Sequence, residues 1–291
     1  IGRFYPIFGA ALLFMAIGIM IALFVNHPPL PEMWKGFGVK YDKNPIFPMM
    51  FISIACGAIS GFHATQSPLM ARCITDEGKG RIVFYGAMVS EGIVALIWAA
   101  AATAYFGEHG TDFTAAQIVL DISKTWLGKV GGILAVIGVV AAPISSGDTA
   151  LRSARLIVAD FFKIRQKSIG SRLAISVPLF VITFFALFYS LRDKEGFNII
   201  WRYFAWSNQT LSVFTLWAVT VYLTKHRKNV LVTLIPAMFM TVVTVTYIFM
   251  APEGFRLAPW IAYIIAGVTA LAFLILYLTW KSRFDKKNIA Q

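Results

Sequence analysis

The chain has 291 residues, of which 58% are hydrophobic, 15% are aromatic and only 14% are charged. With a mean hydropathy of +0.71, this composition excludes an ordinary soluble domain, which could not bury so much apolar surface. The formal net charge is +12, but the lysines and arginines gather at the ends of long apolar runs. That placement is typical of membrane proteins and not of a nucleic-acid-binding face. We therefore expect a polytopic helical protein whose partner is the lipid bilayer.

Eight apolar stretches are each long enough to cross about 30 Å of hydrocarbon as a helix. They cover residues 7–25, 46–70, 82–106, 130–162, 172–191, 199–224, 229–250 and 258–280. The second stretch is interrupted by a polar motif, and the fourth is longer than a bilayer. The pattern predicts an all-α fold in one transmembrane domain over residues 1–291, with one broken helix.

The connections between these stretches predict the orientation of the chain. If residues 1–6 are cytoplasmic, fifteen lysines and arginines lie in inner connections and tails, against eight in outer ones. The positive-inside rule then places both termini in the cytoplasm. In the outer connection 107–129, Thr114 precedes an amphipathic run. This predicts a capped helix over 114–124 that lies across the outer mouth.

The motif GAISGFHATQSP, residues 57–68, breaks the second apolar stretch. Gly57, Gly61 and Pro68 lower helix propensity, and the hydroxyl and amide side chains can bind backbone groups that the break frees. Non-helical backbone at membrane depth is tolerated only beside protein or a water-filled cavity, and transporters bind substrate at such breaks. A kink that serves only packing is the alternative. For His63, a hydrogen-bonded structural role and a proton-carrying role are equally compatible with the sequence.

Glu91 lies about nine residues into the third stretch, near the expected middle of the membrane. A carboxylate at that depth is either paired or protonated more readily because it is desolvated. The second case would suit a proton-coupled site. A Glu that only bonds a neighbouring helix is the alternative.

The fourth stretch ends in APISSGDTALRSAR, which places Ser145, Asp148, Arg152 and Arg155 on one helical face. Asp148 and Arg152 have the i,i+4 spacing of an ion pair near the inner interface. A backbone carbonyl and two hydroxyls from Ala142, Ser145 and Ser146 could bind a small cation such as sodium. The alternative is a polar seal of the cytoplasmic side.

The sixth stretch contains Arg202 and the run Ser207-Asn208-Gln209-Thr210. Four consecutive polar side chains point around the whole helix, so some must face the helix bundle, where they either bind a ligand or join helices. The motifs of intramembrane hydrolases do not fit. Ala58 replaces the first glycine of GxSG, Ser145 replaces that of GxGD, and HExxH is absent. We therefore do not expect an enzyme.

Four long blocks of the sequence resemble the carbon starvation protein A family of bacterial inner-membrane transporters. They are SGFHATQSPLMARC (60–73), GRIVFYGAMVSEGIVALIWAAAA (80–102), APISSGDTALRSARLIVAD (142–160) and RYFAWSNQTLSVFTLWAV (202–219). The resemblance implies secondary uptake of small nutrients, namely pyruvate by proton symport and short peptides. It also implies a leucine-transporter-like inverted-repeat fold of the amino acid–polyamine–organocation superfamily, of which this chain would be the second repeat and the C-terminal part. The first repeat, which would supply half of a central site, would then precede Ile1, and the 291 residues alone should not transport.

The sequence thus predicts a secondary transporter with alternating access that imports a small carboxylate, pyruvate first, together with a proton and without a cofactor. Peptide or amino acid uptake, coupled to sodium instead, is the alternative within this class, and a non-transporting membrane sensor or assembly subunit is the alternative outside it. In this hypothesis Glu91 or His63 transfers the proton, and Asp148 with Arg152 helps to close the inner gate. The expected substrate-binding residues are Ser60, Gly61, His63, Thr65, Gln66, Ser67, Asn208 and Gln209.

Overall fold

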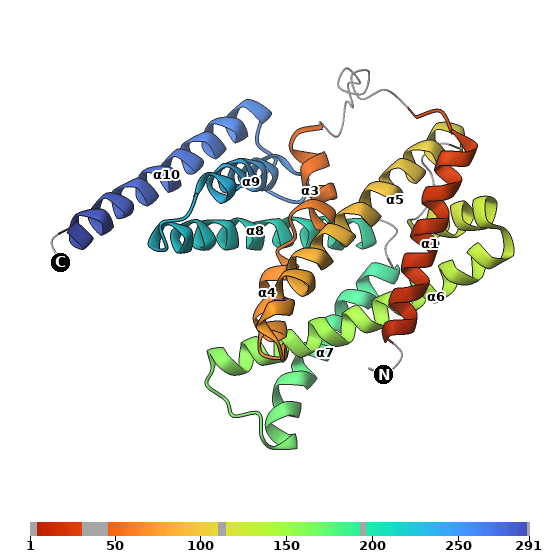
Figure 1. The fold of residues 1–291 in the computed structure, drawn as a ribbon, viewed down its shortest axis with the longest axis horizontal. Helices are drawn as coiled ribbons and strands as arrows, with labels where there is room; N and C mark the ends of the chain where they lie inside the picture. Colours follow the sequence, from red (N-terminus) through yellow and green to blue (C-terminus); the bar gives the residue numbers. More distant parts are fainter. Residues whose placement is uncertain (1–4, 31–45, 110–114, 193–195, 290–291) are drawn as a thin grey trace. The chain divides into compact units, whose positions relative to one another are not determined.

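The computed structural model describes residues 5–30, 46–109, 115–192 and 196–289, and every regular element in these ranges is helical (Figure 1). The helices are α1 (Tyr5–Asn26), α3 (Ile46–Ala58), α4 (Phe62–Ala71), α5 (Ala87–His109), α6 (Ala115–Phe161), α7 (Ile169–Arg192), α8 (Gly196–Lys225), α9 (Leu231–Met250) and α10 (Pro259–Ile289). A 3₁₀ turn, Glu77–Lys79, and a π-helical turn, Arg81–Gly86, lead into α5. The predicted all-helical class is confirmed.

Polar residues and proline define several helix ends. Before α7, the Ser168 hydroxyl accepts a hydrogen bond from the Ser171 amide at 3.1 Å. Before α9, Asn229 Oδ1 accepts from the Leu231 amide at 3.0 Å. Both bonds satisfy a first-turn N–H that has no partner inside the helix. α10 begins at Pro259, where the missing N–H of proline leaves no donor unsatisfied.

Five helices of the described residues are long and apolar enough to cross a membrane: Pro6–Asn26, Glu77–Tyr105, Ile169–Arg192, Leu231–Met250 and Pro259–Lys286. They make the chain a multi-pass membrane protein. The remaining predicted spans correspond to the α3–α4 pair, the C-terminal part of α6, and α8. α3 and α4 are separately too short to cross, with 13 and 10 residues, and α8 contains the polar Asn208 and Gln209. The count of eight spans stays a prediction.

The chain divides into two compact units. The first comprises Ile1–Val39 with Ile74–Phe184, and the second comprises Lys40–Cys73 with Phe185–Gln291. The core of the first unit joins α1, α5 and α6 through the buried side chains Met15, Ile19, Ala101, Tyr105, Ile118, Ile122 and Ala135. The Tyr105 hydroxyl also donates to Asp121 Oδ2 at 3.2 Å, which links α5 to α6.

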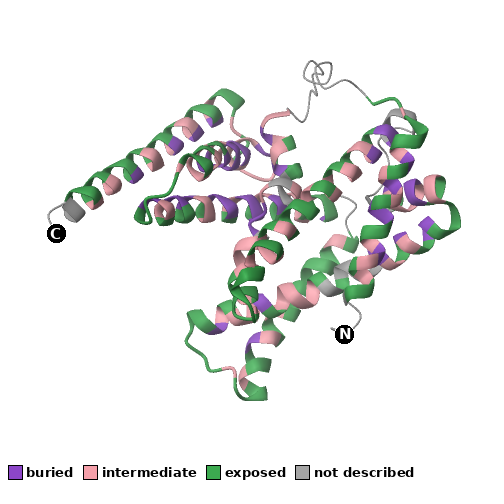
Figure 2. Cartoon of the chain, viewed as in Figure 1, coloured by how far each residue is buried: buried purple, intermediate pink, exposed green. Residues whose placement is uncertain are grey.

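The second unit packs α3, α8 and α10 around α9, and its buried residues are concentrated on α8 and α9 (Figure 2). Its core contains Ile52, Ala205, Val213, Trp217, Ala237, Met240, Val243, Tyr247, Ala251 and Tyr277. Buried hydrogen bonds join these helices. Trp217 Nε1 donates to Thr241 Oγ1 at 3.1 Å, and the hydroxyls of Thr224 and Tyr277 lie 2.8 Å apart. Polar side chains therefore hold helices together here, as is common where lipid removes the hydrophobic driving force between helices.

The predicted outer helix and the fourth span form one chain of helical residues, α6, that changes direction at Gly128. Gly128 has φ +63° and ψ −148°, a conformation that only glycine adopts readily. A Cβ placed on Gly131 would lie 2.1 Å from the Ser123 carbonyl oxygen. In a straight helix these residues would be about 12 Å apart along the axis, so the segment 115–127 folds back on the start of the span. Thr114, the predicted cap, lies outside the described residues.

Candidate functional site

The break in the second predicted span is confirmed, and it is shorter than the motif suggests. α3 ends at Ala58 and α4 begins at Phe62, so only Ile59, Ser60 and Gly61 lie between the two helices. Pro68 does not end the helix but lies within α4. Thr65, Gln66 and Ser67 are half-buried helical residues, so the break covers only a small part of the motif 57–68. A proline costs one backbone bond but does not terminate a helix that is held by its neighbours.

Gly61 allows the break to contact the backbone of α8. A Cβ placed on Gly61 would lie 2.1 Å from the Asn208 carbonyl oxygen and 2.9 Å from the Ser212 amide nitrogen. No side chain fits at those distances, so α4 begins directly against α8. The amide groups of His63 and Ala64 donate to the carbonyls of Ser60 and Gly61, at 3.3 and 3.0 Å. These two bonds satisfy two of the N–H donors in the first turn of α4.

A buried polar cluster lies where the break meets α8, and it consists of Ser60, Asn208, Gln209 and Ser212. Asn208 Nδ2 donates to the Ser60 hydroxyl at 3.4 Å. The Ser212 hydroxyl donates to the Gln209 carbonyl at 2.7 Å and lies 3.4 Å from Gln209 Oε1. The structure thus brings together predicted residues that are 148 positions apart.

Gln209 is the unusual member of this cluster. Its side chain is fully buried, and its Nε2 finds no hydrogen-bond acceptor among the described residues. A buried amide group without an acceptor is unfavourable by about 1–3 kcal/mol. Such a donor is well suited to a carboxylate or carbonyl oxygen, so the cluster can bind an acceptor-rich small molecule.

The other predicted residues of the second unit lie around this cluster in less buried positions. His63, in the first turn of α4, is half-buried, Ser207 is exposed, and Thr210 donates back to the Trp206 carbonyl of its own helix at 2.9 Å. Of the four consecutive polar residues on α8, only Asn208 and Gln209 are therefore buried. The roles of His63, Thr65, Gln66 and Ser67 stay predictions.

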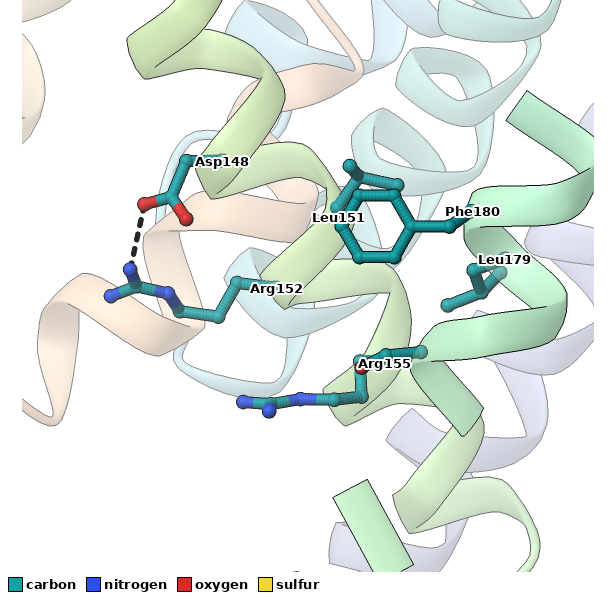
Figure 3. Close-up of a pocket in the computed structure, with 7 residues that line it drawn as sticks. Asp148, Leu151, Arg152, Arg155, Leu179 and Phe180 are labelled. Atoms are coloured by element: carbon teal, nitrogen blue, oxygen red, sulfur yellow. Dashed lines mark hydrogen bonds and ion pairs between the residues drawn. The ribbon is translucent and has the colours of Figure 1, made fainter. Parts of the chain in front are cut away.

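In the first unit, Asp148 and Arg152 form the predicted i,i+4 ion pair, with Oδ2 and Nη2 2.7 Å apart (Figure 3). The pair lies at the edge of a cavity of about 430 Å³ between α6 and α7, lined by Asp148, Leu151, Arg152, Arg155, Ser176, Leu179 and Phe180. Arg155 is half-buried, and its Nε has no hydrogen-bond partner among the described residues. The cavity thus combines two guanidinium groups with an apolar wall, and its function as an inner gate stays a prediction.

Two further predicted sites of the first unit are not tested by the described residues. Glu91 is exposed on α5, on a segment whose neighbours Met88, Ile93 and Leu96 are exposed as well. Ser146 is exposed, and the side chains of Ala142 and Ser145 lie outside the described residues. The proposed roles of Glu91 in proton transfer and of Ala142, Ser145 and Ser146 in sodium binding stay predictions.

Sequence reasoning missed a second polar cluster of the second unit, formed by Arg202, Tyr203, Tyr247 and Glu253. The carboxylate of Glu253, in the turn between α9 and α10, lies 2.7 Å from Arg202 Nε and accepts a 2.7 Å hydrogen bond from the Tyr247 hydroxyl. Glu253 stands in a short Pro-Glu-Gly turn that reads as an ordinary loop, and no spacing relates it to Arg202, 51 positions away. The only signal is an arginine inside an apolar stretch, which requires a partner.

The sequence pattern of the family described as carbon starvation protein CstA matches residues 7–124 and 110–247 of the chain. The chain belongs to the carbon starvation protein CstA family. Both the break with its α8 contacts and the α6–α7 cavity lie inside the matched residues, whereas Glu253 lies beyond them.

Three relatives illustrate the similarity to other CstA-family proteins. The chain is 28% identical over 289 residues to "Peptide transporter CstA" of Bacillus subtilis, covering 80% of this chain and 48% of the relative. It is 38% identical over 93 residues to "Pyruvate/proton symporter BtsT" of Escherichia coli, covering 30% and 13%. It is 45% identical over 125 residues to an uncharacterized membrane protein of Haemophilus influenzae, covering 36% and 33%. The chain spans less than half of each relative's length. No solved structure matches it significantly.

Proposed function

We propose that this chain is part of a secondary transporter that imports a small carboxylate, pyruvate first, by proton symport in the bacterial inner membrane. The observation behind the proposal is the buried Gln209 Nε2, which has no acceptor among the described residues and lies in a polar cluster beside a helix break. A helix break at membrane depth is where transporters place substrate. A carbonyl or carboxylate oxygen of the substrate would accept from this amide, and alternating access would follow from movement around the break.

The relatives support this function without defining the substrate. One relative is named a peptide transporter and another a pyruvate/proton symporter, so peptide or amino acid uptake is the second candidate. The relatives are more than twice as long as the matched part, and we propose that a preceding segment of the protein supplies the other half of the site. Both termini of this chain would be cytoplasmic.

The direct test is uptake of radiolabelled pyruvate by proteoliposomes that contain the full-length protein, with proton and sodium gradients imposed separately. We expect accumulation that requires an inside-alkaline gradient and that unlabelled pyruvate abolishes. Uptake of labelled dipeptides without uptake of pyruvate would transfer the proposal to peptides. Sodium-driven uptake without a proton gradient would make sodium the coupling ion, with Ser145 and Ser146 as its candidate ligands. Substrate binding without any flux would instead indicate a sensor.

The substitution Gln209→Leu tests the site itself. It removes the buried amide and keeps a similar volume, so we expect at least a tenfold loss of uptake with no loss of thermal stability. Thr210→Val is the matched control, because the Thr210 hydroxyl only bonds its own helix and should not affect uptake. Full uptake by Gln209→Leu would exclude Gln209 from the binding site.

A further inference from the structure

The Glu253 carboxylate is held by an unequal set of contacts. Its side chain is only 5% exposed, and Oε1 receives both the Tyr247 hydroxyl and the Arg202 guanidinium, each at 2.7 Å. The Tyr203 hydroxyl donates to the Glu253 backbone carbonyl at 2.6 Å and anchors the turn to α8. Oε2 is buried and has no hydrogen-bond partner among the described residues. Oε1 therefore has one hydrogen bond and one ion-pair contact, whereas Oε2 has neither among the described residues.

Arg202 is less constrained than Glu253. Its side chain is 40% exposed, and although its Nε lies 2.7 Å from Oε1, the N–H does not align as a hydrogen bond. An arginine has five N–H donors in a planar fork that binds carboxylates through two parallel bonds. This guanidinium therefore neutralises Glu253 but uses little of its capacity, and it is accessible to a second carboxylate.

Few other charged or titratable groups approach the pair. Tyr203 comes from α8 and Tyr247 from α9, and in the turn itself Arg256 donates to the Pro252 carbonyl. The first titratable side chain of α10, Tyr263, packs its ring against Phe47 of α3, and the described side chains of α3 include no titratable group. Within the described residues, Arg202 is thus the cation that forms an ion pair with Glu253.

We propose that Glu253 binds Arg202 where the substrate carboxylate would otherwise bind. When the substrate displaces Glu253 from Arg202, Glu253 takes up the coupled proton. This inference rests on the proposed carboxylate–proton symport. A buried carboxylate that loses its counter-ion becomes strongly unfavourable and binds a proton. The substrate carboxylate binds the guanidinium, a proton from solution forms an O–H bond with Glu253, and no other bond changes. One negative and one positive charge enter together, so each cycle couples one carboxylate to one proton.

The coupling predicts that Glu253→Gln and a control variant outside the cluster respond differently to a proton gradient. In proteoliposomes with the full-length protein, we expect the wild-type protein to take up pyruvate several-fold faster with an inside-alkaline gradient. Glu253→Gln should lose that stimulation, with a ratio of about one, but should still exchange labelled for unlabelled pyruvate. Thr215→Val, also on α8, removes only a hydroxyl that bonds the Leu211 carbonyl of its own helix and should keep the stimulation.

The outcomes separate the two proposals. Wild-type uptake that no proton gradient stimulates would overturn the proposed symport itself. A stimulated wild type together with an equally stimulated Glu253→Gln would overturn only the assignment of Glu253. A second measurement needs no variant: pyruvate added to the purified wild-type protein in weakly buffered detergent solution should raise the pH as protons are bound. Pyruvamide, which lacks the carboxylate, should not, and absence of proton uptake with pyruvate would contradict the exchange.

Discussion

At the scale of single residues, the close contact between Gly61 and the backbone of α8 explains the position of the buried polar cluster better than residue polarity does. Gly61 was expected to weaken the helix, and the structure shows that it also lets α4 begin against the backbone of α8. The same contact brings Ser60 to Asn208 and so defines the edge of the buried polar cluster. The glycine is thus required by a packing partner that is nearly 150 residues away in the sequence.

The substitution Gly61→Ala should therefore destabilise the protein. The added methyl group would overlap the Asn208 carbonyl, and overpacking of this kind costs about 1–3 kcal/mol. We expect a Tm several degrees below that of the wild type in detergent, with reduced uptake. Gly267→Ala on α10 is the control, because nothing lies within 4 Å of its Cβ position and alanine favours helices by about 1 kcal/mol. Equal Tm values for the two variants would argue against the close contact.

At the scale of elements, α6 shows how one glycine turns a continuous helical pattern into two segments. The positive φ of Gly128 reverses the chain, and Gly131 then lies against the backbone of Ser123. The outer segment thereby contributes Ile118 and Ile122 to the same core as Met15 of α1. The reversal therefore converts an outer connection into part of the core of the first unit.

Gly128→Ala should disturb this reversal. An L-residue at that positive φ is strained by about 1–2 kcal/mol, so we expect a lower Tm and faster proteolysis within residues 115–130. Gly147→Ala in the same helix has open space around its Cβ position, and its Tm should equal or exceed that of the wild type. An unchanged proteolysis pattern in Gly128→Ala would contradict the conformation assigned to Gly128.

At the scale of the whole molecule, the charges and the helices predict one orientation in the membrane. The exposed basic residues Arg227 and Arg283 follow or end helices of the second unit on the predicted inner side, and Arg256 lies in the predicted outer turn. The Glu253 proposal places proton entry at that outer turn. The orientation of the chain in the membrane therefore determines the side from which the proton enters in that proposal.

Labelling of single cysteines with a membrane-impermeant thiol reagent checks this orientation. In a background in which Cys56 and Cys73 are serine, we expect Arg256→Cys to react in intact cells. Arg227→Cys and Arg283→Cys should react only after the membrane is permeabilised, because the positive-inside rule retains them in the cytoplasm. Labelling of Arg283→Cys in intact cells would invert the topology.

The sequence by itself determined the helical membrane class, the broken second span and the Asp148–Arg152 pair, because periodicity, hydropathy and i,i+4 spacing are local properties of the chain. The family was indicated by four long blocks of sequence that resemble its members. Only the tertiary structure decided that the break is three residues long, that Asn208 and Gln209 but not Ser207 are buried, and that Arg202 pairs with Glu253. Each of these depends on which helices are neighbours, and local spacing does not encode contacts between distant segments. The burial of the Glu253 carboxylate could therefore not be predicted from the sequence, because it depends on the contacts among α8, α9 and the turn before α10.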